Sequence, residues 1–379
     1  MAARLLGAGA TVAVWNRTRG RADVLRSIGA RRADSPADAA SSADIVITML
    51  ADPDALRAVL DGTQGVLDAL RPGMLLVDCS TVGPEMARIV AGQCRERGAT
   101  FVDAPVLGSV PSAEQGTLTI LAGGASVDID RAHPVLALFG RTVVRTGDAG
   151  SASALKLVMN LLIGGQTELM AEAFLLAERA GLDKDVVKDA LTGSVLNSPF
   201  VGYTAPQLLD RTFSPLFTTA LLLKDIDLAL DLARAHDLAL PGVRAVRDAY
   251  AASSAHGRTD EDYSAVIATL DVTGDRDGGA GPVTYEVTAI VEPRIAARYE
   301  QFMCGTHIRE IVRTGCFLHG RFQRTEEGHY RTSYLAASHV EVVRYIETHA
   351  PRFSEQLAAA FPDGVSITRA IWSERARWP

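Results

Sequence analysis

The chain has 379 residues, of which 38 are basic and 45 acidic, for a net charge of -7. No basic run or stripe interrupts this acidic balance, so the composition argues against nucleic acid or an anionic membrane as a partner and favours a small molecule. A hydrophobic content of 47% with 22% charged residues is ordinary for a globular protein of two or three domains.

Residues 1–147 alternate short apolar runs with helical patterns. Such alternation predicts buried strands joined by helices, which is a Rossmann-like α/β domain with a mostly parallel, doubly wound sheet. The predicted strands cover residues 11–15, 45–50, 75–78, 100–103 and 118–122.

Residues 148–270 lose these strand-like runs and become helical in period, which predicts an all-α domain. Its predicted helices cover residues 152–180, 183–191, 216–236 and 242–252. Residues 271–283 are rich in Gly and Asp and have no period, so they predict a linker.

Residues 284–379 predict a third domain of a different class. Strand-like segments at 285–292, 316–324, 330–336 and 365–374 are separated by helical segments at 293–314 and 339–361. The order βαββαβ is that of an α+β, ferredoxin-like split βαβ domain. Dimerisation and ligand sensing are its two expected roles, and no group of residues in it favours one of them.

The four cysteines show neither metal-ligand spacing nor a disulfide framework, which predicts reduced thiols, no metal site and a cytoplasmic protein: Cys79, Cys94, Cys304 and Cys316. No apolar stretch is long enough to span a bilayer, and residues 1–6 do not resemble a signal peptide.

Lys156 is one of only four lysines among the 38 basic residues, and small or apolar residues surround it. Burial can lower the pKa of an amine but cannot deprotonate a guanidinium, so a lysine here suits proton transfer. Asn160 lies one helical turn later on the same face, where its amide could hold a substrate oxygen. The structural alternative is a lysine whose stem packs on an amphipathic helix while its amine reaches water.

Several further motifs accompany Lys156 and Asn160. Residues 78–81 (Asp-Cys-Ser-Thr) and 101–109 (Phe-Val-Asp-Ala-Pro-Val-Leu-Gly-Ser) follow predicted strands, where ligands bind in an open α/β sheet. With the Gly-rich run 116–124 and residues 223–229 (Leu-Lys-Asp-Ile-Asp-Leu-Ala), this set resembles the β-hydroxyacid dehydrogenases, the family of 3-hydroxyisobutyrate dehydrogenase. The resemblance covers residues 1 to about 270.

The resemblance implies a role for each matching position. Lys156 would be the general acid that protonates the nascent alkoxide, and the base in the reverse direction, while Asn160 would hold the substrate. Relatives that reduce imines usually lack this lysine, so a carbonyl or alcohol substrate is expected. The carboxylate pocket of the substrate would be lined by Leu107, Gly108 and Ser109, and the cofactor would be bound by Asn16, Arg17, Thr18, Met49, Leu50, Thr81 and Lys224. For Thr81 and Ser109 the alternative is an ordinary turn hydroxyl.

Two departures from the family stand out. The substrate loop reads Leu107-Gly108-Ser109 where the family often has Ser-Gly-Gly, which changes the expected substrate contacts. Residues 1–6 read as the helix that follows the first strand and its G-x-G-x-x-G turn, and neither that strand nor that turn precedes them. We therefore expect a sheet without its first strand, and either a start at a downstream in-frame Met or a truncated gene. A chain that is complete as given would have a weakened cofactor site.

The second predicted strand is followed by Asn16, Arg17 and Thr18, where an NAD enzyme typically carries an acidic residue. These side chains suit a 2′-phosphate, so NADP(H) is favoured over NAD(H), although an exposed arginine after a strand would look the same. The sequence thus predicts an NADP-dependent oxidoreductase of small β-hydroxyacids and aldehydes, at least dimeric. The rival hypothesis is a catalytically impaired scaffold or metabolite sensor, favoured by the missing glycine turn.

Overall fold

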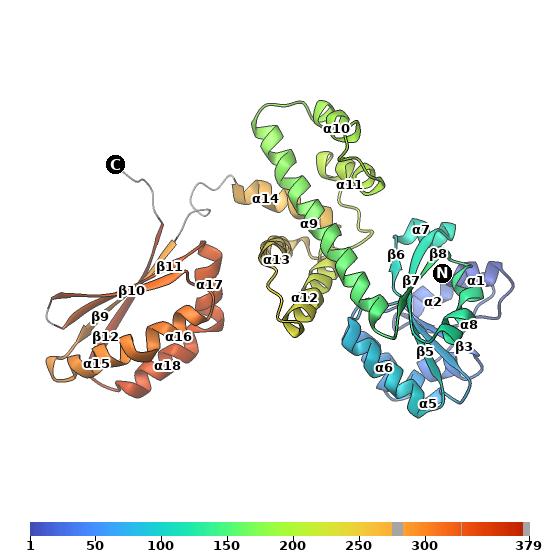
Figure 1. Cartoon of the computed structure of the whole chain (residues 1–379), viewed down its shortest axis with the longest axis horizontal. Coiled ribbons are helices and arrows are strands. Elements are labelled where there is room, and N and C mark those ends of the chain that lie inside the picture. Colours follow the sequence, from blue (N-terminus) through green and yellow to red (C-terminus); the bar gives the residue numbers. More distant parts are fainter. Residues whose placement is uncertain (275–282, 327, 374–379) are drawn as a thin grey trace. The chain divides into compact units, whose positions relative to one another are not determined.

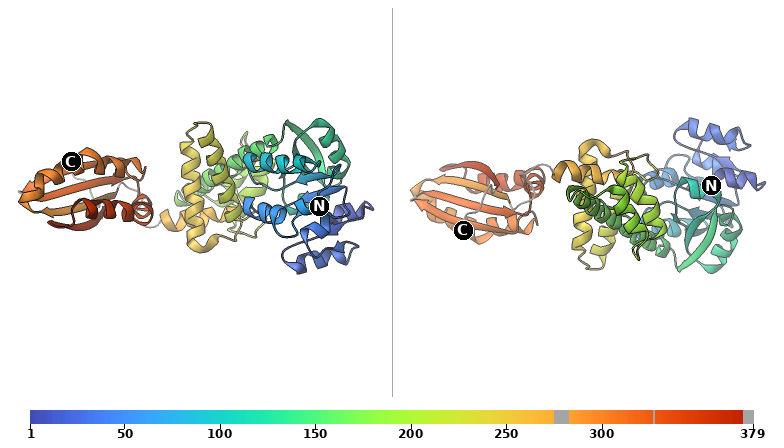
Figure 2. Two further views of the ribbon diagram at one scale, coloured as in Figure 1. Left: turned by 90° about the horizontal axis from the view of Figure 1, so that it is seen from below. Right: turned by 90° about the horizontal axis from the view of Figure 1, so that it is seen from above.

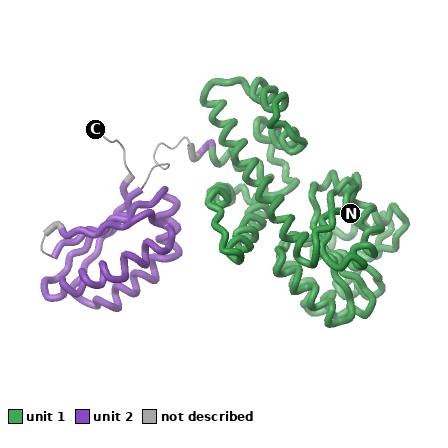
Figure 3. Tube along the Cα trace, in the orientation of Figure 1, with its two compact units in different colours: residues 1–270 green, residues 271–379 purple. Residues whose placement is uncertain are grey.

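A computed structural model describes residues 1–274, 283–326 and 328–373 of the chain. These residues divide into two compact units, Met1–Leu270 and Asp271–Pro379 (Figure 3).

The first unit contains a six-stranded sheet with the order β3-β4-β5-β7-β6, and β8 pairs with β7 (Figure 1). Strands β3 (Ile45–Thr48), β4 (Leu75–Asp78) and β5 (Thr100–Asp103) are parallel, as predicted. Strand β7 (Leu118–Gly123) runs antiparallel to β5 and to the short β6 (Val106–Leu107) and parallel to β8 (Gly140–Gly147). The sequence did not predict this reversal, nor strands β6 and β8.

Strand β1 (Ala13–Val14) pairs only with β2 (Arg31–Arg32), in a separate two-stranded parallel sheet. In the doubly wound order, the first strand lies between the second strand and the fourth. Here β1 corresponds to the second strand of that order and β3 to the fourth, and the two belong to different sheets.

Helices cover both faces of the larger sheet. Leu75 and Val77 of β4 face one core cluster, and Leu76 faces the other, because successive side chains of a strand point to opposite faces. This two-sided burial explains the continuous apolar runs seen in the sequence. The helices are α1 (Ala2–Gly7), α2 (Arg19–Arg26), α3 (Pro36–Ala40), α4 (Pro53–Asp61), α5 (Val66–Ala69), α6 (Pro84–Glu96), α7 (Val110–Gln115) and α8 (Ser126–Leu136).

The remainder of the first unit is helical and is built on α9 (Ser151–Arg179), a helix of 29 residues. Helices α12 (Thr219–Ala235) and α13 (Pro241–Ser253) pack beside it (Figure 1). The other helices are α10 (Lys184–Thr192), α11 (Pro199–Leu209) and α14 (Val266–Gly274). The sequence did not predict α11, which has Pro199 at its start and Pro206 inside it.

Helix α14 continues to Gly274, so the first residues of the predicted linker are helical, and residues 275–282 of that linker lie outside the described residues.

The second unit has a four-stranded antiparallel sheet with the order β10-β11-β9-β12. Its strands are β9 (Val283–Val291), β10 (His319–Glu326), β11 (His329–Ala336) and β12 (Val365–Ser373). Helices α15 (Ala296–Phe302), α16 (Ile308–Arg313), α17 (His339–Thr348) and α18 (Ala350–Ala360) lie on one face of the sheet only (Figures 1 and 2). This is the predicted ferredoxin-like arrangement, although β10 begins at His319 rather than Cys316.

Candidate active site

The N-terminus of α9 is attached to the end of β5 by a buried carboxylate. The backbone N–H of Ser153 donates to Asp103 Oδ2 at 2.8 Å, and Asp103 is 1% exposed. Gly123 makes room for this carboxylate, since a Cβ at that position would lie 2.3 Å from Asp103 Oδ1. Lys156 follows Ser153 by three residues, so the sheet determines where the first turns of α9 place its amine.

Lys156 is largely buried, and burial lowers the pKa of its amine from 10.5 to about 8. Asp225 opposes this effect by favouring the charged form, while the neighbouring ammonium of Lys224 adds to it. Both protonation states of Lys156 are therefore accessible near neutral pH, which is what a group that gives and takes a proton requires.

Asn160 is fully buried and faces a carboxylate from the neighbouring helix α12. Its Nδ2 donates to Asp225 Oδ2 at 2.5 Å, and Asp225 itself is 2% exposed. Burial raises the pKa of Asp225, whereas Lys224, Lys156 and Asn160 act in the opposite direction. Because an ionised carboxylate only accepts hydrogen bonds, it fixes which end of the amide faces it. Asn160 Oδ1 is left with no partner.

Lys224 connects helix α12 to the loop that follows β4. Its Nζ lies 2.6 Å from Asp225 Oδ1 and donates to the carbonyl oxygen of Thr81 at 2.6 Å. The structure therefore brings together four positions singled out in the sequence, namely Lys156, Asn160, Lys224 and Thr81, around one carboxylate.

Asp225 was not assigned a role from the sequence, although it follows Lys224 directly. The sequence does place this acidic residue beside a motif lysine in an apolar helix. The burial of the Asp225 carboxylate, however, depends on the packing of α9 against α12.

The loops after β3 and β4 are held together by buried polar groups that the sequence reasoning also missed. Thr48 Oγ1 donates to Asp78 Oδ1 at 2.7 Å, and Ser80 Oγ donates to the same oxygen at 2.6 Å. The backbone N–H of Leu50 donates to Ser80 Oγ at 2.9 Å, which places Leu50 near the Thr81 loop. Met49, the other predicted cofactor residue of this loop, is 55% exposed.

The predicted substrate loop lies at the end of β6. Gly108 has a φ of +116°, and a Cβ there would lie 2.9 Å from side-chain carbons of Leu118 and Ser112, so a glycine is required. Leu107 ends β6 and Ser109 precedes α7. Within the described residues no hydrogen bond joins this loop to Lys156 or Asn160.

Asn16, Arg17 and Thr18 form an exposed turn between β1 and α2. Asn16 Oδ1 accepts a hydrogen bond from the Thr18 N–H at 2.8 Å, and the Thr18 side chain makes no capping hydrogen bond to the helix. The turn follows β1 of the two-stranded sheet, and within the described part of the chain no hydrogen bond or ion pair joins it to the residues around Lys156.

Across residues 1–274, 283–326 and 328–373, no three His, Cys, Asp or Glu side chains gather closely enough to hold a metal ion. Of the described helices, none is both long and apolar enough to cross a membrane.

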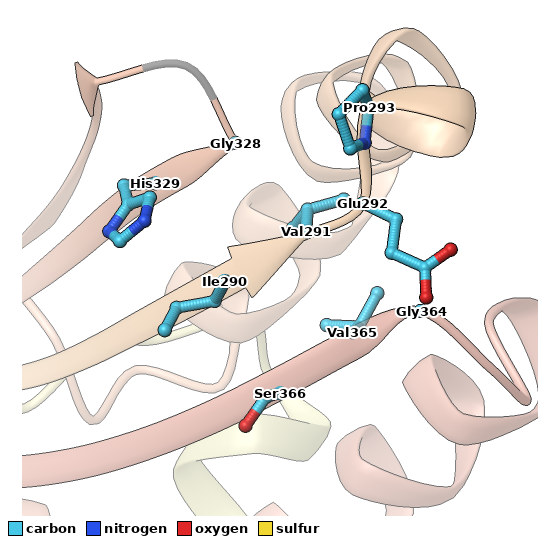
Figure 4. Close-up of a pocket in the computed structure, with 9 residues that line it drawn as sticks. All are labelled: Ile290, Val291, Glu292, Pro293, Gly328, His329, Gly364, Val365 and Ser366. Carbon is cyan, nitrogen blue, oxygen red and sulfur yellow. The ribbon is translucent and has the colours of Figure 1, made fainter.

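An open hollow of about 520 Å³ lies in the second unit, at the ends of β9, β11 and β12. Figure 4 shows Glu292, His329 and Ser366 around it, with Ile290 and Val365 between them. It holds no lysine and none of the predicted site residues, so we place the candidate active site around Lys156 instead.

Comparison with known proteins gives a match for each part of the chain. Residues 1–147 match the NAD binding domain of 6-phosphogluconate dehydrogenase, and residues 150–270 match the family described as NAD-binding of NADP-dependent 3-hydroxyisobutyrate dehydrogenase. Residues 282–374 match a domain of unknown function, DUF4286.

Individual relatives match the first unit. Glyoxylate/succinic semialdehyde reductase 2 of Arabidopsis thaliana is 33% identical over 73% of this chain and 77% of its own length. A solved structure of Mycobacterium tuberculosis 3-hydroxyisobutyrate dehydrogenase with L-serine is 34% identical, with a TM-score of 0.65 over 71% of this chain and 94% of that one. The cytokine-like nuclear factor N-PAC of Xenopus tropicalis is 33% identical over 69% of this chain and 49% of its own length.

Proposed function

The chain belongs to the β-hydroxyacid dehydrogenase family of NAD(P)-dependent oxidoreductases, and we propose that it interconverts a small β-hydroxyacid and its aldehyde with Lys156 as the general acid and base. The observation that carries this proposal is the cluster of Lys156, Asn160, Asp225 and Lys224. It combines an amine of pKa about 8 with an amide oxygen that has no partner.

Each residue of the cluster has a defined task in the proposed reaction. During reduction the Lys156 ammonium gives its proton to the developing alkoxide, and during oxidation the neutral amine removes the hydroxyl proton. Asn160 Oδ1 accepts a hydrogen bond from the substrate hydroxyl, because its Nδ2 is committed to Asp225. Asp225 orients Asn160 and keeps the pKa of Lys156 from falling further.

NADP(H) is the cofactor of the matched family, with NAD(H) as the alternative, and when bound it supplies or accepts the hydride. The residues present fit two parts of it. Lys224 is bonded to the Thr81 carbonyl and Leu50 to the adjacent Ser80, so these residues, with Met49 of the same loop as Leu50, would hold the nicotinamide end. Asn16, Arg17 and Thr18 stand at the N-terminus of α2, which favours a phosphate group.

The sequence contains no G-x-G-x-x-G turn for the pyrophosphate, and β1 and β3 belong to separate sheets. The residues present therefore fit the nicotinamide end and the 2′-phosphate end of the cofactor, but not its pyrophosphate.

The substrate class is argued from the residues of the proposed carboxylate pocket and from the relatives. Leu107, Gly108 and Ser109 offer backbone groups and one hydroxyl next to an apolar side chain, which suits a short acid. The Arabidopsis relative is named for glyoxylate and succinic semialdehyde, and the solved mycobacterial relative for 3-hydroxyisobutyrate. We propose a substrate of that size for this chain.

A second candidate function is a dehydrogenase-like scaffold or metabolite sensor. The match to N-PAC supports it, since that relative is named as a nuclear factor rather than as a reductase. The cluster around Lys156 argues against it, because a scaffold has no need to bury two lysines beside a carboxylate.

We also infer a homodimer or a higher homo-oligomer. Four exposed apolar side chains lie on one side of α9, opposite Lys156, at spacings of four and seven residues: Val158, Leu162, Leu169 and Leu176. The molar mass of the chain in solution tests this inference.

The experiment that tests the function uses the purified full chain with NADPH and a panel of small aldehyde acids that includes glyoxylate and succinic semialdehyde. We expect oxidation of NADPH, and a loss of turnover of about a hundredfold or more in Lys156→Ala. Lys184→Ala is the matched control, because Lys184 is exposed and paired with Asp210 on the surface. Equal turnover in Lys156→Ala would refute the role of Lys156, and the absence of turnover with every substrate would favour the scaffold.

A further inference from the structure

Asp78 is a buried carboxylate at the end of β4 to which the proposed function gives no task. It is 1% exposed, and its Oδ1 accepts hydrogen bonds from Thr48 Oγ1 at 2.7 Å, from Ser80 Oγ at 2.6 Å and from the Ser80 N–H at 3.2 Å. Thr48 and Ser80 are themselves buried. A carboxylate in this position costs desolvation energy, so its hydrogen bonds must be satisfied for the loops to keep this conformation.

These bonds join two loops that belong to neighbouring strands. Thr48 is the last residue of β3, and its partner in the β3–β4 ladder is Asp78. Ser80 Oγ also accepts the Leu50 N–H at 2.9 Å, so both loops are attached to one carboxylate. All three bonds end on Oδ1, which an asparagine would retain, so the variant that removes the acceptor is Asp78→Leu, whose side chain is of similar size.

The residue after Ser80 connects this network to the catalytic helix. The Thr81 carbonyl accepts from Lys224 Nζ at 2.6 Å, and Lys224 Nζ lies 2.6 Å from Asp225 Oδ1. Asp225 Oδ2 in turn accepts from Asn160 on α9 at 2.5 Å. Hydrogen bonds and the peptide bond between Ser80 and Thr81 therefore connect Thr48 to Asn160. Asp78 is the residue of this series that belongs to strand β4.

We propose that Asp78 is a positioning residue, which holds the Thr81 carbonyl where Lys224 can bridge it to Asp225. The catalytic significance of this arrangement rests on the proposed role of Lys156. Without the Asp78 network, the loop after β4 relaxes and Lys224 loses one of its two partners. Of the two partners Asp225 remains, so Lys224 then competes more strongly with Lys156 for this carboxylate.

The test uses the small number of lysines in the chain. With ¹³C-labelled lysine, the full chain without cofactor or substrate gives signals from Lys156, Lys184, Lys188 and Lys224 only, and single Lys→Arg variants assign them. In Asp78→Leu, Lys156 loses part of the attraction from Asp225, which pairs more closely with Lys224. We therefore expect the pKa of Lys156 to fall further below about 8, by about half a unit or more.

In the same variant the Lys224 signal is expected to shift, whereas Lys184 and Lys188 on α10 stay unchanged. Asp262→Leu is the matched control, because Asp262 is an equally buried carboxylate of the first unit, and it accepts from the backbone N–H groups of Leu216 and Phe217. Its loss is expected to lower the melting temperature without moving the titration of Lys156.

Unchanged Lys156 and Lys224 titrations in a folded Asp78→Leu chain would overturn the proposal. If Asp78→Leu does not fold, Ser80→Ala replaces it, since this variant removes the hydroxyl that joins Leu50 to Asp78 but keeps the carboxylate. A smaller fall of the Lys156 pKa is then expected, and no fall would overturn the proposal. The titrations need no turnover, so a chain that proves not to be a reductase can still support the positioning role. An active reductase with unmoved lysines refutes that role alone.

Discussion

Lys156 in the first unit is a partly buried base and His307 in the second a buried one; burial lowers the pKa of both, but their neighbours differ. Lys156 lies beside Asp225, which opposes the burial, so its pKa stays at about 8. His307 is 6% exposed and packs against aromatic rings, with ring centroids 4.9 Å from Phe302 and 5.7 Å from Phe353, and its pKa falls to about 4.

The comparison teaches that burial alone does not make a functional base. A carboxylate placed beside the amine keeps both protonation states of Lys156 accessible near neutral pH, whereas His307 remains neutral in the folded chain. The difference lies in the neighbouring helix: α12 supplies Asp225 to Lys156, and the elements around His307 supply mainly aromatic carbon.

The largest expected effect comes from removing the charge of Asp225. In Asp225→Asn the pKa of Lys156 falls below about 8, because the interaction that raised it is lost, so less ammonium is available at neutral pH. We expect the rate of aldehyde reduction to fall by about tenfold or more, which steady-state kinetics at pH 7 would measure. Asp231→Asn, an exposed position on the same helix, is the control and should leave the rate unchanged. A fully active Asp225→Asn chain would show that Lys156 does not depend on its neighbour.

The next effect is the pH dependence of the two directions of the reaction. Reduction requires the Lys156 ammonium, so its rate falls as the pH rises through about 8, and oxidation requires the free amine, so its rate rises over the same range. Rate profiles measured in both directions would show the opposite trends.

Lys156→Arg sharpens this test, because a guanidinium does not lose its proton in this range. The inflection near pH 8 should disappear in that variant. Its persistence would assign the titration to another group.

The smallest effect concerns His307, for which we expect a change in stability and none in turnover. Its folded pKa lies below that of the unfolded chain, so the unfolded state binds the additional proton, and this stability is lost as the pH falls from about 6.5 towards 4. In His307→Phe this component of the pH dependence should vanish.

Thermal unfolding of the full chain at pH 7 and pH 5, followed by the circular dichroism of its tyrosines, checks this expectation, since five of the eight tyrosines lie in the second unit. A loss of NADPH turnover in His307→Phe would instead mean that the second unit contributes to the reaction.

Much of the fold could be read from local patterns. The continuous apolar runs at residues 45–50, 75–78 and 100–103 predicted the parallel strands β3, β4 and β5, since both faces of that sheet are buried. The βαββαβ order of the second unit was likewise predictable. Strand β1 lies inside the segment predicted at residues 11–15, whereas β2 has only two residues, too few for a period to show, and the reversed direction of β7 has no signature in its own residues.

The sequence by itself determined the family resemblance, the one-turn spacing of Lys156 and Asn160, and the presence of a lysine where arginine is the usual cation. Only the tertiary structure decided that Asp225 lies against Asn160, that Lys224 reaches the carbonyl of Thr81, and that Asp78 joins two loops. The reason is physical: helical spacing is a local property of the chain, whereas these contacts join residues 65, 143 and 30 positions apart, and their burial depends on how α9, α12 and the sheet pack together.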